Sequence, residues 1–350
     1  MNMKCLMEYT PEELHTLVKE LGQPAFRAKQ VNEWLMRGMR PEEMTNLPKA
    51  LREELRNIPF GGATIREKYR SSQDGTVKYL FALEDGNLVE GVLMRYHHGN
   101  TLCLSTQVGC RMNCAFCAST LDGRVRDLTA GEMLSQITAI ERDEPKTQSG
   151  RAVTNVVLMG SGEPLDNYDN VVAFLHRAVS PDGLGISARN ISLSTCGLVP
   201  NMRRLMQEAP PVTLCVSLHA HSDEQRSAIM PINRAYPISE VLGAAKAYAE
   251  QTGRRVIFEY ALIDGVNARN EDAVALANRL KGINCHVNII PLNPVPERDL
   301  KGATRKQAMQ FAAWLTEKHV SATVRREMGT DIEGACGQLR RRVLSEDGGV

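Results

Sequence analysis

TLCLSTQVGCRMNCAFC (residues 101–117) joins an apolar strand pattern, Thr101–Thr106, to a loop with three closely spaced cysteines. Cys110, Cys114 and Cys117 follow the strand in a C-x3-C-x2-C arrangement. Three thiolates this close in sequence can converge on one inorganic centre. A [4Fe–4S] cube has four irons, so three protein ligands leave one iron open. The spacing therefore predicts a [4Fe–4S] cluster with chemistry beyond electron storage.

A zinc site is the alternative for these three cysteines. Zinc commonly accepts three cysteines and one histidine, and His97, His98 or His219 could complete such a site. Zinc sites usually draw on two paired C-x2-C knuckles, and the sequence contains no second one. This comparison favours the iron–sulfur interpretation.

From about residue 100 the chain alternates strand and helix patterns. Further strands are expected at 153–159, 190–194, 212–218, 255–262, 286–291 and 320–325, and helices at 129–140, 170–178, 200–208, 239–251, 271–281 and 304–318. Such alternation implies a parallel sheet with right-handed crossovers. Six strand–helix units are too few for a closed eight-fold barrel. The sequence predicts an α/β fold with an open, partial (β/α)6 barrel over residues 98–325.

The remaining segments have different patterns. Residues 1–60 predict a small helical accessory domain, with a capping box at Thr10-Pro11-Glu12-Glu13 and helices over 11–21, 25–36 and 48–57. Residues 61–97 predict a β-rich extension, with strands at 64–69, 77–83 and 88–95. Residues 326–350 form a C-terminal segment.

Composition limits the possible partners and location. The chain has 350 residues, 42 Lys and Arg against 41 Asp and Glu, and a net charge of +1, so it has no global attraction to nucleic acid or membrane. No apolar run approaches the roughly 18 residues of a membrane span. Glu8, Glu12 and Glu13 near the start argue against a targeting segment. We expect a cytoplasmic protein with no membrane partner.

Nine cysteines in such a chain fit reduced thiols and metal ligands better than a disulfide framework. Cys5, Cys196, Cys215 and Cys285 are expected in the core. Cys336 differs, because Gly334 and Gly337 leave it in a thin, adaptable loop where we expect a reactive thiol.

Polar residues recur where successive strands are expected to end. They are Gly162 and Glu163 after the second strand, Ser194 after the third, Ser217, Leu218 and His219 after the fourth, and Asn293 after the sixth. A turn, a helix start or a cap accounts for each one alone. Parallel α/β folds bind ligands at this carboxyl rim, so their joint placement predicts a binding site.

The cysteine motif, with Phe116 before its third cysteine, resembles the radical S-adenosylmethionine (SAM) superfamily. The resemblance implies that the open iron binds the amino and carboxylate groups of SAM. It also implies one-electron cleavage of SAM to a 5′-deoxyadenosyl radical, with the rim residues holding SAM.

The whole chain resembles the RlmN family of dual-specificity RNA (adenine-C2) methyltransferases. The segments that carry this resemblance are LGQPAFRAKQVNEWL, TLCLSTQVGCRMNCAFC, VVLMGSGEPLDNYDNV, ISLSTCGLVP, VSLHAHSDEQRSAIMPINR, IIPLNP and GTDIEGACGQL. It implies that Cys336 is first methylated by one SAM, that Cys103 is its partner, and that Glu90 is a proton acceptor. For Glu90, an outward-facing carboxylate on a strand is the other interpretation.

The resemblance also implies substrates and partners. The expected targets are adenosine 2503 of 23S rRNA and adenosine 37 of tRNAs, with two SAM molecules used per turnover. A flavodoxin-type electron donor is expected, and the chain is expected to act as a monomer. Adenine C2 is an electrophilic carbon with no lone pair, so it cannot attack a sulfonium methyl group, whereas a thiolate can.

Two basic clusters are candidates for phosphate contact. Arg27, Lys29, Arg37 and Arg40 make the second helix and its end locally basic, although a solvated face accounts for them equally well. The second cluster flanks Cys336 and consists of Arg325, Arg326, Arg340, Arg341 and Arg342.

Two further functions stay open at this point. A Cfr-type enzyme shares the two-cysteine chemistry but methylates C8 of the same rRNA adenosine. A sensor that binds a cluster or RNA without methylating is the second. Glu163-Pro164 and the N-terminal segment favour the C2 enzymes.

Overall fold

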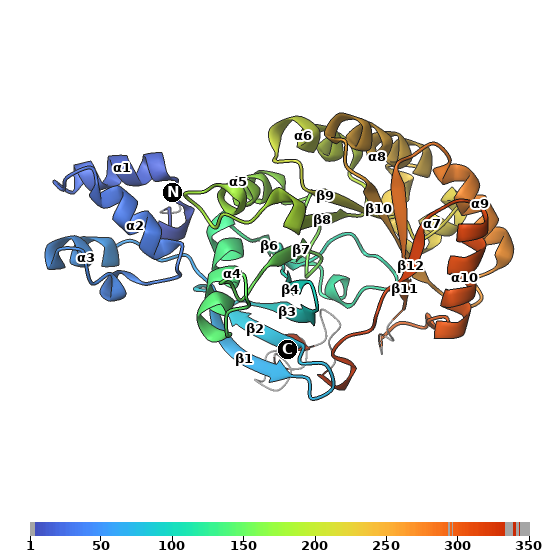
Figure 1. Ribbon diagram of the computed structural model, residues 1–350, viewed down its shortest axis with the longest axis horizontal. Helices are drawn as coiled ribbons and strands as arrows, with labels where there is room; N and C mark the ends of the chain where they lie inside the picture. Colours follow the sequence, from blue (N-terminus) through green and yellow to red (C-terminus); the bar gives the residue numbers. More distant parts are fainter. Residues whose placement is uncertain (1–3, 293–294, 296, 333–338, 341–342, 344–350) are drawn as a thin grey trace.

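The computed structural model describes residues 4–292, 295, 297–332, 339–340 and 343 of the chain. Its centre is a ten-stranded sheet in the order β1-β2-β3-β4-β7-β8-β9-β10-β11-β12, with helices along its outer side (Figure 1). The strands are β1 (Thr64–Arg70), β2 (Val77–Ala82), β3 (Leu88–Tyr96), β4 (Gly99–Cys103), β7 (Asn155–Leu158), β8 (Ile191–Thr195), β9 (Thr213–Ser217), β10 (Val256–Leu262), β11 (Cys285–Pro291) and β12 (Ala322–Val324). A separate two-stranded ribbon contains β5 (Gln107–Gly109) and β6 (Arg124–Asp127).

The strands β4, β7, β8, β9, β10, β11 and β12 pair parallel with one another in this order and form the barrel. The helices that connect or follow them are α4 (Ala130–Asp143), α5 (Tyr168–Val179), α6 (Val199–Glu208), α7 (Asp223–Ile229), α8 (Ile238–Thr252), α9 (Asn270–Leu280) and α10 (Arg305–Glu317). The strands β1 and β12 lie at opposite edges of the sheet, so the described sheet does not close. The predicted α/β fold with an open (β/α)6 barrel is therefore confirmed.

Strand burial explains why these segments form a parallel sheet. On β10 every residue except Ile257 is buried, which is typical of a strand covered on both faces. On β8, Ile191 and Leu193 are wholly buried and alternate with partly exposed residues. Side chains from both strands join one main core beneath the helices.

Three short helices precede the sheet, as the sequence predicts: α1 (Pro11–Glu20), α2 (Arg27–Leu35) and α3 (Lys49–Arg56). Thr10 starts α1 through a reciprocal cap, because its hydroxyl accepts from the Glu13 amide and its own amide donates to the Glu13 carboxylate. Arg177 of α5 donates to the Tyr9 carbonyl and to Asn32, which ties the helical unit to the barrel.

Residues 61–97 continue the barrel sheet instead of forming a separate layer. The pairs β1–β2, β2–β3 and β3–β4 are antiparallel. Leu80 and Leu88 of this extension pack against Leu339 and Val343. The described C-terminal residues therefore cover part of the sheet extension.

Several boundaries differ from the predictions. The strand expected over 101–106 ends at Cys103. Beyond Leu104 the amides leave the ladder, because the Ser105 amide donates to the Gln136 side chain and the amides of Thr106 and Gln107 donate to the Ser161 carbonyl. The sequence patterns predict neither the β5–β6 ribbon nor α7, since three to seven residues are too few to show a hydrophobic period. Across the described ranges, no helix is both long and apolar enough to cross a membrane.

Candidate active site

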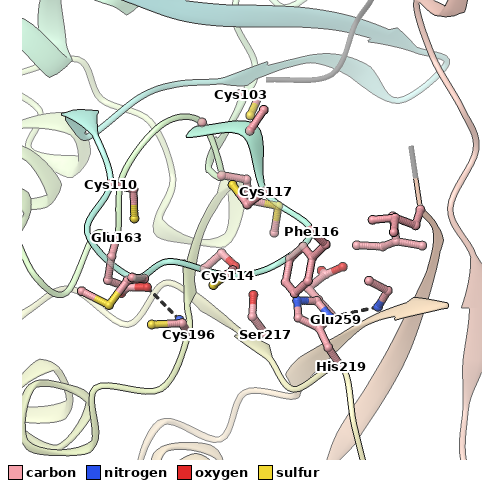
Figure 2. Close-up of a pocket in the computed structure, with 18 of the residues that line it drawn as sticks. Cys103, Cys110, Cys114, Phe116, Cys117, Glu163, Cys196, Ser217, His219 and Glu259 are labelled. Carbon is pink, nitrogen blue, oxygen red and sulfur yellow. Dashed lines mark hydrogen bonds between the residues drawn. The ribbon is translucent and has the colours of Figure 1, made fainter. Parts of the chain in front are cut away.

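A cavity of about 360 Å³ opens where the parallel strands end. Its wall is built by residues at or near the carboxyl ends of β4, β7, β8, β9, β10 and β11, and the cysteine loop closes one side (Figure 2). A cavity of this size is suited to a small-molecule ligand. Its location agrees with the carboxyl rim at which the sequence predicts a binding site.

The three clustered cysteines all line this cavity (Figure 2). Burial raises the pKa of Cys110 to about 12 and also raises the pKa of Cys114. Buried thiolates of this kind need a bound metal cation to hold their negative charge. Together with Cys117, they form a donor set that fits an iron–sulfur cluster.

Two of the three histidines that could complete a zinc site lie outside the cavity. His98 stacks on Tyr96 and meets His97 edge to face, and neither histidine lines the cavity.

Backbone contacts hold the cysteine loop at two points. Gly109 has φ +76°, and a Cβ there would lie 2.0 Å from the Gly123 carbonyl oxygen, so this approach requires glycine. The Cys110 amide donates to that same carbonyl at 2.9 Å. The Ala115 amide donates to the carbonyl of Ile229, the last residue of α7, also at 2.9 Å. The short helix α7 thus supports the cysteine loop.

Gly162 and Glu163 lie in the cavity wall after β7. Gly162 has φ +110°, and a Cβ there would lie 2.7 Å from the Gln107 amide nitrogen. The Glu163 carboxylate is buried and accepts from the amides of Cys196 at 2.7 Å and Leu165 at 3.0 Å. Burial raises the Glu163 pKa against these hydrogen bonds. The carboxylate therefore also braces the loop that follows β8.

The other predicted rim residues have different environments. Ser194 and Ser217 line the cavity. Leu218 is wholly buried in the main core and is absent from the cavity wall, because its side chain points to the opposite side of the chain from its neighbours. Asn293 lies outside the described residues.

His219 combines an unusual backbone with a neutral ring. Its φ is +57°, and its Nδ1 accepts from the Ala261 amide at 2.9 Å. That bond assigns the ring proton to Nε2. Burial, with a smaller effect from Arg226, lowers the His219 pKa to about 3. The ring meets Phe116 of the cysteine motif edge to face, with centroids 4.8 Å apart.

Sequence reasoning missed two buried residues of this cavity, Cys196 and Glu259. Cys196 is buried as expected, but it packs beside Cys114 at the cavity rather than in the main core. Glu259 is 4% exposed, accepts from Asn288 Nδ2 at 2.8 Å, and has a pKa raised by burial. A carboxylate inside the apolar strand VIFEYAL was the available signal for Glu259.

Cys103 ends β4 in the same cavity wall, packed against Val92 and Met94. Glu90 belongs to the same face of β3 as Val92 and Met94, because side chains alternate along a strand. Glu90 does not line the described cavity wall. It is not the outward-facing carboxylate that strand patterns alone suggest, since only 2% of it is exposed.

Both Glu90 oxygens have partners. Oε2 pairs with Lys78 Nζ at 3.2 Å, and Oε1 accepts from the Arg340 amide at 2.7 Å. The Glu90 side chain thus holds a described residue of the C-terminal segment. Cys336 itself lies outside the described residues. No disulfide joins two of the described cysteines.

The residues of the two predicted basic clusters differ in how open they are to a phosphate. Arg325 and Arg326 line the cavity. Arg340 is mostly buried and lies 3.7 Å from Asp122, so it is not an open phosphate contact. Lys29 is exposed on α2.

Comparisons with known proteins now identify the family. A model of the radical SAM superfamily matches residues 104–277, and a model of the ribosomal RNA large subunit methyltransferase N-terminal domain matches residues 4–59. A crystal structure of a radical SAM methyltransferase from Sphaerobacter thermophilus superposes with a TM-score of 0.90 at 42% identity, covering 95% of this chain and 98% of that chain.

Two curated relatives match almost completely. A probable dual-specificity RNA methyltransferase RlmN from Lachnoclostridium phytofermentans is 52% identical over 335 residues, 95% of this chain and 93% of that protein. Its counterpart from Clostridium perfringens is 50% identical over 349 residues, 99% of each chain. The chain belongs to the RlmN family. The predicted family is confirmed, and RlmN membership implies a [4Fe–4S] cluster and SAM as cofactors.

Proposed function

We propose that this chain uses SAM to methylate C2 of adenosine 2503 in 23S rRNA and C2 of adenosine 37 in tRNAs. Its RlmN membership supports RNA methylation of the radical SAM type. One structural observation carries the two-cysteine mechanism. Cys103 lines the same cavity as Cys110, Cys114 and Cys117, so a further sulfur lies beside the cofactor site (Figure 2).

The three clustered cysteines would bind three irons of the cube and leave the fourth to SAM. Gly162, Glu163, Ser194, Ser217 and His219 belong to the rim that would surround SAM, and Leu218 and Asn293 complete the predicted set. When bound, the cluster and SAM supply a one-electron route to a radical that removes hydrogen from a methyl group. A low-potential donor such as a flavodoxin would provide the electron, and we expect a monomer.

The two catalytic cysteines solve the problem of an unreactive carbon. The Cys336 thiolate takes the methyl group of one SAM, forming an S–C bond as the sulfonium bond breaks. After hydrogen removal with a second SAM, the thiomethylene carbon bonds to adenine C2, giving a protein–RNA adduct. Radical addition leaves one unpaired electron on the adduct, and this electron would return to the oxidised cluster as the C2 proton leaves. The Cys103 thiolate then attacks the Cys336 sulfur. The new S–S bond replaces the bond between the Cys336 sulfur and the methylene carbon, and this carbon takes up a proton to become the C2 methyl group. The resulting disulfide is then reduced.

Glu90 is the acceptor of the C2 proton in this proposal. Its carboxylate is already bonded to Lys78 and to the Arg340 amide. A carboxylate has about four acceptor sites, so these two partners leave lone pairs that can take the proton.

Nucleoside analysis of RNA treated with the anaerobically reconstituted chain tests the proposal. We expect 2-methyladenosine in both rRNA and tRNA. A product of 8-methyladenosine would establish the Cfr-type alternative, and no methylated product from a protein with full iron and sulfide content would favour the sensor.

Cysteine variants test the two-cysteine mechanism. Cys336→Ala should retain the cluster, lose its S-methyl group in protein mass spectrometry and form no product. Cys103→Ala should accumulate RNA covalently attached to protein, because nothing attacks the Cys336 sulfur. Normal yield of released product from Cys103→Ala would remove Cys103 from the mechanism.

A further inference from the structure

Arg226 is a wholly buried arginine beside the cavity that the mechanism above does not use. It lies on α7, between the ends of two barrel strands. Its Nη2 donates to the Cys196 carbonyl at 2.6 Å and to the Ser217 carbonyl at 3.0 Å. Its Nε donates to the Leu218 carbonyl at 3.1 Å, and its Nη1 donates to the Asn233 side-chain oxygen at 3.1 Å. The guanidinium is thus held rigidly, with its planar fork spanning β8 and β9.

These four acceptors are neutral oxygens. A buried charge is normally paired with an opposite charge, because burial without a partner is costly. Burial lowers the Arg226 pKa, and the groups whose negative charge would oppose this most are Cys196, then Cys114. Asp223 acts more weakly, and its carboxylate accepts from the Ile238 amide. Cys196, whose carbonyl accepts from Arg226, packs in one cluster with Cys114 and Cys117. The described part of the site therefore holds a fixed positive charge next to the cysteine loop.

We propose that Arg226 is the built-in counter-charge of the cluster held by Cys110, Cys114 and Cys117, and that it raises the reduction potential of this cluster. The inference rests on the proposed function only in that the three cysteines bind a [4Fe–4S] cluster. Three thiolates outweigh the charge of the oxidised cube by one negative charge, and reduction by one external electron adds another. A fixed cation stabilises the more negative, reduced state more strongly.

Arg226 is a positioning residue, because its hydrogen bonds are all to groups of the protein itself. Its charge acts on the cluster, and its hydrogen bonds hold the strand ends and the base of α7. These two effects are separable. Lysine keeps the charge but loses the fork, whereas glutamine and methionine lose the charge.

Arg177 offers a matched control. It is also a mostly buried arginine with neutral acceptors, namely the Tyr9 carbonyl and Asn32 Oδ1. It lies on α5 against the N-terminal helices and does not line the cavity. Its replacement disturbs a similar buried network without altering charge beside the cysteines.

The test is a redox titration of the full chain, reconstituted anaerobically with iron and sulfide and followed by electron paramagnetic resonance of the reduced cluster. Dithionite serves as the electron donor. Arg226→Gln and Arg226→Met should lower the ratio of reduced to oxidised cluster about tenfold at a given potential, a midpoint about 59 mV more negative. Arg226→Lys should keep most of the wild-type midpoint, and Arg177→Met should keep all of it.

Several outcomes would overturn the proposal. One is a wild-type midpoint in Arg226→Gln or Arg226→Met at full iron content. Another is a shift in Arg226→Lys that is as large as in the neutral variants at every pH from about 6 to 10, which would assign the effect to hydrogen bonding. If both neutral variants fail to fold, Arg226→Lys provides the test. A buried lysine loses its proton readily, so a rise in pH removes the charge without a further substitution. Its midpoint must then fall as the pH rises from about 6 to 10, and a constant midpoint contradicts the proposal.

Failure of the proposed function is distinguishable from failure of this inference. Wild-type protein that takes up zinc, without iron and sulfide, removes the cluster and with it the radical mechanism. Wild-type protein with a normal cluster, whose midpoint ignores the charge at position 226, removes only the role of Arg226.

Discussion

At the residue scale, the site depends on side chains that act on backbone groups as much as on a ligand. Glu163 accepts two amides from different loops, and His219 accepts the Ala261 amide in a left-handed conformation. Both side chains are buried, so a change in the charge of either one changes the free energy of unfolding. Burial penalises the charged imidazolium and the charged carboxylate alike.

His219 predicts how stability depends on pH. Its pKa is about 3 in the folded chain and 6.5 when the ring is free in water, so between these values the unfolded chain binds the extra proton. Its contribution is therefore present above pH 6.5 and is lost as the pH falls toward 3, by up to about 1.4 kcal/mol per pH unit. Urea unfolding of wild type and His219→Asn at pH 7 and pH 5 measures this, because asparagine keeps an acceptor and tolerates the backbone.

In His219→Asn the loss of stability between the two pH values should be smaller than in wild type. His15→Asn, on the exposed side of α1, is the control and should retain the wild-type pH dependence. Equal pH dependence in His219→Asn and wild type would show that the buried imidazole is not responsible.

At the element scale, the sheet extension and the C-terminal segment stabilise one another. Leu80 and Leu88 pack against Leu339 and Val343, and Glu90 joins Lys78 to the Arg340 backbone. The Lys78 and Glu90 side chains are 1% and 2% exposed. Removing one member of such a pair leaves the other charge buried, which costs more than the intact pair contributes.

Glu90→Gln should therefore destabilise the chain by roughly 3 kcal/mol, because it leaves the Lys78 ammonium buried without its carboxylate. Lys78→Met combined with Glu90→Gln should recover most of this loss, since the double variant contains no buried charge at the pair. Urea unfolding measures both effects, and amide hydrogen exchange at Arg340 reports on the C-terminal segment. A double variant that is no more stable than Glu90→Gln would refute the coupling.

At the scale of the whole molecule, the helical unit of α1, α2 and α3 lies beside the barrel (Figure 1). We expect this unit to contribute to RNA binding. Because the net charge is only +1, RNA binding must depend on local clusters of lysine and arginine. Lys29 and Arg37 are exposed at the second helix. Each lysine or arginine that contacts a phosphate releases counterions and steepens the dependence of binding on salt.

Lys29→Ala with Arg37→Ala should weaken tRNA binding and lower the slope of log K against log salt by about two, one for each phosphate contact. The measurement is the tRNA dissociation constant over a series of KCl concentrations. Lys246→Ala, at an exposed position on α8, is the control and should leave the slope unchanged. An unchanged slope in the double variant would place the RNA elsewhere on the surface.

Sequence patterns were sufficient to predict the helices and strands in which a hydrophobic period is repeated over many residues. The capped helix α1 and the buried strands β8 and β10 follow from local residues, because a hydrophobic period sustained over several turns or alternations rarely occurs outside a helix or a strand. The short α7 and the β5–β6 ribbon could not be predicted, although they support the cysteine loop. Their formation depends on contacts made after the chain has folded.

The candidate site divides in the same way. Cys110, Cys114 and Cys117 form a local motif whose spacing alone indicates a cluster, and the family motifs extend this to an RlmN protein. Only the tertiary structure brings Cys103, Cys196 and Glu259 into the same cavity. It also turns Glu90 toward Lys78 and buries Arg226 beside the cysteines. The spacing of residues in the sequence predicts contacts within one segment. Burial and charge pairing depend on contacts between segments that are distant in the chain, so only the tertiary structure determines them.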